Sequence, residues 1–247
     1  MREVRRRRWR PSRARPFATA SDGTVRGVAF SGFPIDGIAF YEQLEADNSR
    51  AFWQANKPRY DASVKQPMLE LTEELAEFGP FHLFRPHNDL RFSKNKPPYK
   101  TQQGAYGESE GGAGFYVQFS ATGLMAGTGY YAMAPDQLAR FRSAVDADAA
   151  GAEVARLAAD AAERGYRIGA ISELKSAPRG FSKDHPRIEL LRRKGLIAVQ
   201  EFGAPAWIHG RTVATRVRQS WAGVADLCGW LDAHVGPSTL PPDDRPF

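Results

Sequence analysis

The stretch Gly114-Phe-Tyr-Val-Gln-Phe-Ser-Ala-Thr-Gly-Leu-Met-Ala-Gly-Thr-Gly-Tyr-Tyr-Ala-Met133 decides the fold of this chain. In its first seven residues, Phe115, Val117 and Phe119 share one face of a strand, and Tyr116, Gln118 and Ser120 share the other. Thr122-Gly123 predicts a turn, and Leu124–Met133 then returns as a second strand. Both faces of this antiparallel hairpin carry apolar side chains. We therefore expect at least one of its strands to be central in a sheet.

Helical and strand-like segments surround the hairpin on both sides. The predicted helices are Asp36–Asp47, with Asp36 as N-cap, Ser49–Asn56, Arg59–Phe78, Pro135–Ala147, Ala152–Arg164, Arg187–Lys194 and Thr212–His234. The further strand candidates are Phe81–Phe84, Asp89–Phe92, Tyr166–Ile168 and Leu196–Phe202. Helices and strands do not alternate regularly, which argues against a doubly wound dinucleotide-binding fold. The pattern predicts a single α+β domain over residues 30–236, with a mainly antiparallel or mixed sheet and helices packed on it.

The positive charge of the chain is concentrated at its N-terminus. The formal net charge is +6, but residues 1–16 hold eight arginines against Glu3, a local balance of +7, so that the remaining residues sum to −1. Residues 1–29 therefore read as a disordered Arg-rich arm. Such an arm can contact nucleic acid, can be a solubilising extension, or can arise from a start codon assigned too early. Residues 237–247, rich in Pro and Asp, are expected to form an irregular C-terminal tail.

Composition restricts the class of protein further. The only cysteine is Cys228, which excludes an intramolecular disulfide and a cysteine-based zinc site and is typical of a cytoplasmic protein. No run of 18 apolar residues predicts a membrane span, and no apolar segment follows the basic N-terminus as in a secretory signal. His82, His87 and Asp89 are close in sequence, but their spacing fits no standard metal site, so no metal is expected.

The strongest candidate for chemistry is the segment Arg85-Pro-His-Asn-Asp-Leu-Arg-Phe-Ser-Lys-Asn-Lys-Pro-Pro-Tyr-Lys-Thr101. Residues 85–100 carry five cationic side chains against Asp89, a balance of +4. An ionised Asp89 between Arg85 and Arg91 would orient both guanidinium groups, which suits bidentate binding of phosphate or carboxylate. Pro97 and Pro98 stiffen the chain that leads to Tyr99.

Each residue of this segment receives a role in the predicted anion pocket. Arg85, Arg91, Lys96 and Lys100 would hold the anion, and the amide of Asn95 adds a donor. Asp89 and Tyr99 are the candidate catalytic residues, with Asp89 orienting the arginines and Tyr99 handling a proton. The competing interpretation is a structural Arg–Asp–Arg network beside a solvated lysine turn, since such networks also perturb charged groups.

The same residues resemble the signature of an uncharacterised bacterial and fungal family, domain of unknown function 2461. The family motif reads Arg…Asp-x-Arg-Phe-Ser-x-Asn/Asp-Lys-x-Pro-Tyr-Lys-Thr. The residues that match it are Arg85, Asp89, Arg91, Phe92, Asn95, Lys96, Pro98, Tyr99, Lys100 and Thr101. Asn88 departs from the motif, because the family usually has a second arginine there. The resemblance implies a family but no assigned activity.

Two further segments carry the resemblance. Asn48–Tyr60 is similar to a family box of asparagines, aromatic residues and lysine, and places Trp53 and Lys57 on a helix face that can meet the 85–101 segment. The stretches 180–186 and 190–195 match a third region, and residues 179–194 again sum to +4. Each segment also has a purely structural interpretation. Asn48–Tyr60 can be a helix cap with a partly buried tryptophan, and residues 179–194 can be a solvated basic face that pairs with the acidic helix at residues 70–77.

Three hypotheses for function remain open on the sequence alone. The first is a pocket for a small phosphate- or carboxylate-bearing ligand, lined by the segment 85–101 with Trp53 and Lys57, in a binding protein or an enzyme. The second is a nucleic-acid or protein-interaction module that uses the arm and the basic clusters, with steep salt dependence. The third is a purely architectural motif. The residues identify no nucleophile, no cofactor and no oligomeric state.

Overall fold

The computed structural model describes residues 29–89, 96–108 and 112–241, and all ranges below lie within them. Nearly all of the predicted Arg-rich arm, most of the expected strand Asp89–Phe92 and the end of the C-terminal tail lie outside the described residues. Among the described residues, no helix combines the length and the apolar character needed to cross a bilayer.

The centre of the fold is an antiparallel sheet. Its strands follow the order β1 (Phe81–Leu83), β2 (Gln102–Glu108), β3 (Gly114–Ser120), β4 (Gly123–Tyr130), β6 (Leu196–Gly203) and β5 (Arg167–Gly169). The expected hairpin forms β3 and β4, with Val117 opposite Ala126, and both strands are central. The predicted α+β class is therefore confirmed, and the sheet is antiparallel at every pairing of the described strands.

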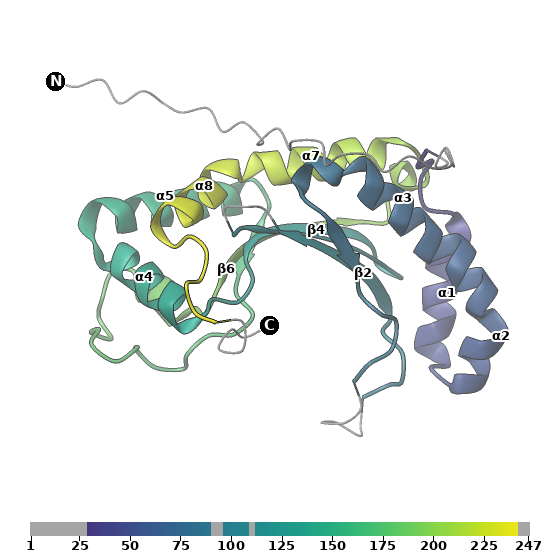
Figure 1. The fold of residues 1–247 in the computed structure, drawn as a ribbon, viewed down its shortest axis with the longest axis horizontal. Helices are drawn as coiled ribbons and strands as arrows, with labels where there is room; N and C mark the ends of the chain where they lie inside the picture. Colours follow the sequence, from purple (N-terminus) through teal and green to yellow (C-terminus); the bar gives the residue numbers. More distant parts are fainter. Residues whose placement is uncertain (1–28, 90–95, 109–111, 242–247) are drawn as a thin grey trace.

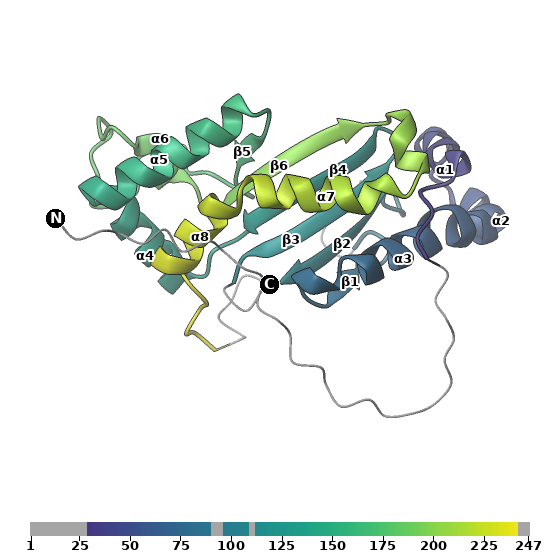
Figure 2. The same cartoon turned by 90° about the horizontal axis from the view of Figure 1, so that it is seen from above.

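Helices cover one face of this curved sheet. They are α1 (Ile35–Ala46), α2 (Arg50–Tyr60), the π-helical segment Asp61–Lys65, α3 (Gln66–Glu74), α4 (Pro135–Asp146), α5 (Asp148–Glu163), α6 (Ile188–Arg192), α7 (Thr212–Gly223) and α8 (Ala225–His234), with 3-10 turns at Ala76–Phe78 and Ala206–His209. The convex face carries α3, α7 and α8, whereas the opposite, concave face bears no helix over its centre (Figure 1). Seen from above, α7 and α8 run along the sheet over its central strands (Figure 2).

The predicted alternation in β3 explains this one-sided cover. Phe115, Val117 and Phe119 are buried against the helices, and Phe119 stacks on Phe33 with ring centroids 4.2 Å apart. A second buried cluster, around Phe141 and Leu191, lies under α4, α5, α6 and α8. The other face of β3 carries Tyr116 and Gln118, and no helix covers its centre.

The first helices differ from the sequence-based expectation. Asp36 is not an N-cap, because α1 starts at Ile35 and the Asp36 carboxylate instead binds the Arg59 guanidinium at 2.7–2.8 Å. The expected break between Asn56 and Arg59 is absent. Helix α2 passes through Pro58, and the π-helical segment that follows keeps the chain helical into α3.

Two other elements differ from the prediction. Strand β2 was not predicted, because its sequence Gln-Gln-Gly-Ala-Tyr-Gly-Glu has weak strand propensity, and pairing with β1 and β3 on its two sides forms it. The long last helix is divided at Val224 into α7 and α8. Tyr166 packs at this division and donates a hydrogen bond to the Ser220 carbonyl at 2.7 Å. A Cβ on Gly223 would lie 2.4 Å from the hydroxyl oxygen of Tyr166.

Candidate functional site

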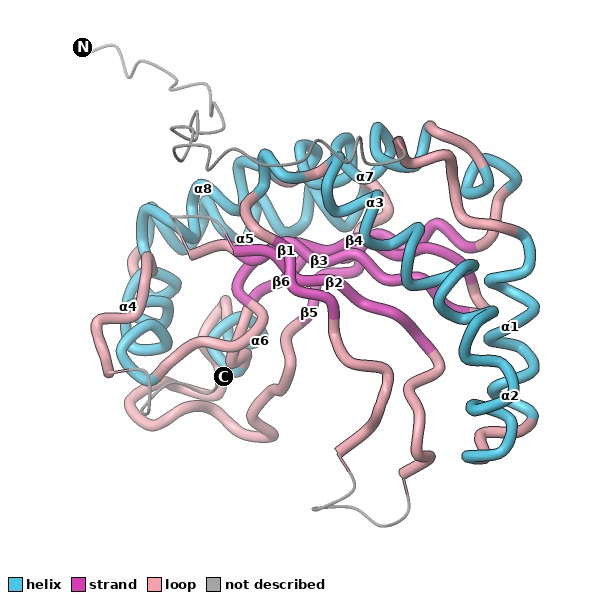
Figure 3. The backbone as a smooth tube through the Cα atoms, turned by 45° about the vertical axis from the view of Figure 1, so that its right-hand side comes forward, coloured by secondary structure: helices cyan, strands magenta, loops and turns pink. Residues whose placement is uncertain are grey.

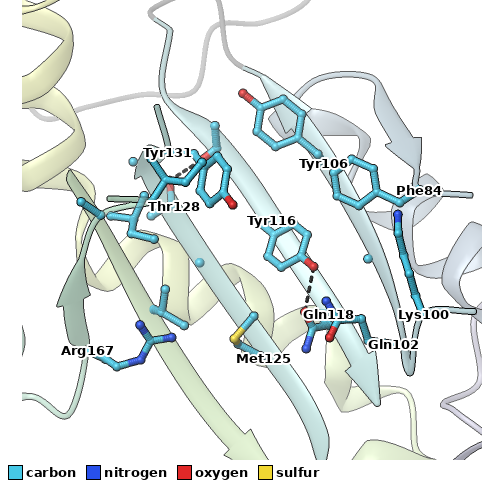
Figure 4. Close-up of a pocket in the computed structure, with 18 residues that line it drawn as sticks. Phe84, Lys100, Gln102, Tyr106, Tyr116, Gln118, Met125, Thr128, Tyr131 and Arg167 are labelled. Carbon is cyan, nitrogen blue, oxygen red and sulfur yellow. Dashed lines mark hydrogen bonds between the residues drawn. The ribbon is translucent and has the colours of Figure 1, made fainter. Parts of the chain in front are cut away.

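A cavity of about 530 Å³ occupies the concave face of the sheet (Figure 4). Phe84 and Lys100, near the two ends of the segment 84–101 that joins β1 to β2, line the cavity together with Ala170 and Ile171 from the loop after β5. Figure 3 shows the described parts of both segments leaving the sheet. Its lining residues are Phe84, Lys100, Gln102, Gly104, Tyr106, Gly114, Tyr116, Gln118, Met125, Gly127, Thr128, Gly129, Tyr131, Arg167, Ala170, Ile171, Ile197 and Val199. Cavities of this size accommodate small molecules.

Aromatic and aliphatic side chains at the rim of the cavity are exposed. Phe84 is 44% exposed, Tyr131 51% and Ile171 38%. Among the described residues these are three of four exposed large hydrophobic side chains, and the fourth, Ile35, lies in α1. Exposed apolar side chains that gather at one depression mark an interaction site rather than scattered surface residues.

Tyr116 lies on the floor of the cavity. Burial, with a contribution from Tyr131, raises the pKa of Tyr116 to about 12. Its phenol therefore stays protonated at neutral pH and donates a hydrogen bond to Oε1 of Gln118 at 2.8 Å. This hydrogen bond fixes the orientation of the Tyr116 ring.

Lys100 is the predicted ligand-binding residue that lines this cavity. Its Nζ lies 5.2 Å from the centroid of the Phe84 ring, and no described carboxylate lies within 4.0 Å of it. Burial, and then the charge of Arg85, lower the pKa of Lys100. The site therefore holds positive charge that the described part of the protein does not neutralise.

A chain of hydrogen bonds from helix α2 positions the root of the segment 84–101. The Tyr60 hydroxyl donates to Oε1 of the buried Gln103 at 2.5 Å, and Nε2 of Gln103 donates to the Phe84 carbonyl at 2.9 Å. Further from the sheet, the backbone N–H of Lys100 donates to the Pro86 carbonyl at 2.7 Å, and the backbone N–H of Asn88 donates to the Pro98 carbonyl at 2.9 Å. The two legs of the segment thus pair with each other, which fixes where Phe84 and Lys100 stand.

Trp53 and Tyr99 support this segment from inside the protein. Their rings stack with centroids 4.4 Å apart and planes 10° apart, and both side chains are 5% exposed. Asn48 holds the backbone of Tyr99 from both sides, since its amide donates to the Tyr99 carbonyl at 3.1 Å and accepts from the Tyr99 N–H at 2.9 Å. Neither ring is part of the cavity lining.

The remaining predicted site residues lie apart from the cavity. Arg85 faces Asp89 at 3.8 Å, and both side chains are at least one-third exposed. Lys57 is exposed and pairs with Asp61 at 2.5 Å, one turn along the helical run. Lys96 is exposed, and Arg91 and Asn95 lie outside the described residues. The described members of the predicted set therefore do not converge on one pocket.

The second basic cluster, residues 179–194, is engaged within the fold. Arg187 donates to the carbonyls of Val145 and Asp146 at the end of α4, at 2.6 and 2.9 Å. Arg192 donates to the Leu174 carbonyl at 2.6 Å. The expected pairing with the acidic helix is not seen, because the carboxylate of Glu77 binds Arg218 of α7 instead.

Sequence reasoning did not assign the aromatic residues of the cavity to a site. Tyr116 and Gln118 were placed on one strand face, but nothing in the local pattern shows that this face stays open. The signal that was available is the alternation of glycine with polar or aromatic residues in Gln102–Glu108. Within the described ranges, no three His, Cys, Asp or Glu side chains come together to hold a metal ion.

Comparison with known proteins is consistent with these motifs. A family model described as "Conserved hypothetical protein (DUF2461)" matches residues 36–230. Searches of curated proteins and of solved structures found no match. The matched residues include the hairpin β3–β4, the segment 84–101 and the Trp53 helix. The chain belongs to the DUF2461 family of conserved hypothetical proteins.

Proposed function

We propose that the concave face of the sheet binds a small ligand that carries a phosphate or carboxylate group, with Lys100 as the cation that holds it. The observation that carries this proposal is the position of the Lys100 ammonium, beside an open cavity and without a carboxylate within 4.0 Å in the described part of the chain. Burial and then the charge of Arg85 lower the pKa of Lys100, and the negative charge of a bound anion would offset both by favouring the ammonium form.

Several other cations of the fold have partners within it. Arg59, Arg140 and Arg218 bind carboxylates or backbone carbonyls of the protein itself. Arg167, on the opposite side of the cavity, faces Glu201 at 3.3 Å with both side chains exposed, so it is a weaker candidate for a second anion contact. The contrast favours Lys100 as the ligand cation. The predicted role of the arm in nucleic-acid binding concerns residues outside the described ranges and stays a prediction.

Replacing Lys100 by methionine tests the proposal. A charge-assisted hydrogen bond contributes about 1.5–3 kcal/mol, so Lys100→Met is expected to weaken binding of methyl phosphate by about 10- to 150-fold. Titration of the full chain followed by NMR measures this affinity. Lys65→Met, which removes an exposed lysine from the helical side, is the matched control and should bind as the wild type. Equal affinity in Lys100→Met and the wild type would refute the proposal.

Methyl phosphate binding should also depend on pH in the alkaline range. The pKa of Lys100 lies below its ordinary value, because of burial and of Arg85, so the ammonium loses its proton earlier than an exposed lysine as pH rises. Phosphate monoesters have their second pKa near about 6, so the charge of the probe is constant above about pH 8. Affinity is therefore expected to fall as pH rises through the Lys100 pKa. Lys100→Arg, whose guanidinium stays charged, should remove this fall; a fall that persists in Lys100→Arg would assign the titration to another group.

A further inference from the structure

We propose that the ligand of this cavity carries a planar aromatic ring in addition to its anionic group, and that the ring stacks on Tyr116. This inference rests on the proposed function, because Lys100 supplies the contact with the acidic group. The ring contact is a separate part of the site and is argued from the shape of the cavity floor.

The two tyrosines face each other across neighbouring strands. Tyr106 of β2 is the direct partner of Tyr116 of β3 in the antiparallel register. Figure 4 shows both rings lying along the strands with their broad faces in view, and with Phe84 beside them. The Phe84 and Tyr116 ring centroids are 6.1 Å apart, with the planes at 43°. Phe84 and Tyr116 thus form an aromatic surface that lines the cavity.

Glycines allow the tyrosine rings to lie flat on the sheet. A Cβ on Gly104 would lie 2.5 Å from the Tyr116 hydroxyl oxygen, and a Cβ on Gly114 would lie 2.5 Å from Cε2 of Tyr106. Each ring therefore covers a glycine of the opposite strand. A larger residue at Gly104 would displace the Tyr116 ring from the sheet, and its face could no longer support a ligand ring lying parallel to the sheet.

The place of Lys100 indicates what the ring carries. Lys100 stands over Phe84, and the Phe84 ring adjoins Tyr116, so the cation and the aromatic floor are adjacent. A ligand with an acidic group on or near an aromatic ring can therefore reach Lys100 while its ring lies over Tyr116. An aliphatic ligand would bury apolar area here but could not stack on flat rings. Complementarity of both charge and shape thus favours an aromatic acid or an aryl phosphate.

Three phosphate monoesters separate the contributions of the ring and the anion. Phenyl phosphate, cyclohexyl phosphate and methyl phosphate share the anion, and the first two have similar apolar size. Stacking of a ring on aromatic side chains contributes about 1–3 kcal/mol, so we expect phenyl phosphate to bind the full chain about 5- to 150-fold more tightly than methyl phosphate. Cyclohexyl phosphate should fall between them. Equal affinity of phenyl and cyclohexyl phosphate would show that apolar burial alone acts, and would overturn the aromatic assignment.

Two substitutions locate the ring contact. Tyr116→Leu should abolish the preference for phenyl over methyl phosphate, and Tyr116→Phe should restore it, because it keeps the ring. Gly104→Ala is a second, independent variant that displaces the Tyr116 ring without removing it, and it should reduce the same preference. NMR of the labelled tyrosine rings should show Tyr106 and Tyr116 shifting with phenyl phosphate. A preference that survives both Tyr116→Leu and Gly104→Ala would overturn the inference.

The outcomes distinguish this inference from the proposed function. If methyl and phenyl phosphate bind equally and both need Lys100, the anion site stands and the ring contact is wrong. If phenyl phosphate needs Tyr116 but not Lys100, the ring contact stands and the anion site is wrong. If no phosphate ester binds, both are wrong. If phenyl phosphate binds only after residues 1–28 are removed, a segment of the chain itself occupies this face, and the inference fails. If Tyr106→Leu changes the oligomeric state of the protein in solution, a second copy of the chain occupies the face, and the inference fails as well.

Discussion

Replacing Trp53 by alanine is expected to lower the free energy of unfolding by about 3–5 kcal/mol, as for other fully packed aromatic side chains. Trp53 is 5% exposed and stacks on Tyr99. It also lies 4.9 Å from the ring of Tyr60 and 6.1 Å from that of Phe40. Its removal leaves a cavity between α1, α2 and the segment 84–101. Urea denaturation followed by circular dichroism measures the loss.

The conservative variant Trp53→Phe is the control, since it retains part of the stack and should lose distinctly less stability. The comparison decides whether Trp53, which the sequence analysis placed in the ligand site, packs beneath the segment 84–101 or contacts a ligand. A Trp53→Ala protein of normal stability that no longer binds methyl phosphate would place Trp53 in the site rather than beneath it.

Replacing Gly123 by alanine should be nearly as damaging. Gly123 has a φ of +101°, and a Cβ there would lie 1.9 Å from the carbonyl oxygen of Gly203 in β6. The substitution therefore adds a backbone collision to an unfavourable φ. Strained φ and overpacking each cost about 1–3 kcal/mol, so the free energy of unfolding should fall by about 2–6 kcal/mol. The loss is measured by the same denaturation experiment.

Gly180→Ala separates the two costs of the Gly123 substitution. Gly180 has a similar φ of +92° and no atom within 4 Å of the position of a Cβ, so it should show the cost of φ alone. If Gly123→Ala and Gly180→Ala lose equal stability, the close approach of β4 to β6 at the turn does not matter to the fold.

The motif 85–101 contains residues that anchor the segment and one residue, Lys100, that lines the cavity. The ring of Tyr99 packs inward on Trp53, and Asn48 holds the backbone of Tyr99, so this part anchors the segment to α2. One residue further, the side chain of Lys100 lies on the cavity side. Neighbouring residues of an extended chain point to opposite sides, which explains why one motif serves both purposes.

Local sequence patterns were sufficient to predict those elements in which the spacing of apolar side chains shows which face is buried. The alternation of Phe115, Val117 and Phe119 predicted β3 with its bounds, because a strand with one buried face must repeat every second residue. The resemblance carried by the segment 85–101 and the Trp53 box likewise identified the family. Strand β2 escaped prediction because its glycines make room for rings of the neighbouring strands, Gly104 for Tyr116 and Gly107 for Phe81, and that requirement lies outside its own sequence.

By itself the sequence determined the α+β class, the central hairpin and the presence of Lys100 in a region of local positive charge. Only the tertiary structure decided which cations have partners and which face of the sheet is open. Arg187 and Arg192 are basic in the sequence, but their charges are directed to backbone carbonyls brought close by folding. Lys100 is distinguished from them by the absence of a described carboxylate within 4.0 Å and by the aromatic floor beside it. Both properties depend on residues distant along the chain, because a hydrogen bond or a cavity wall is defined by position in space and not by separation in sequence.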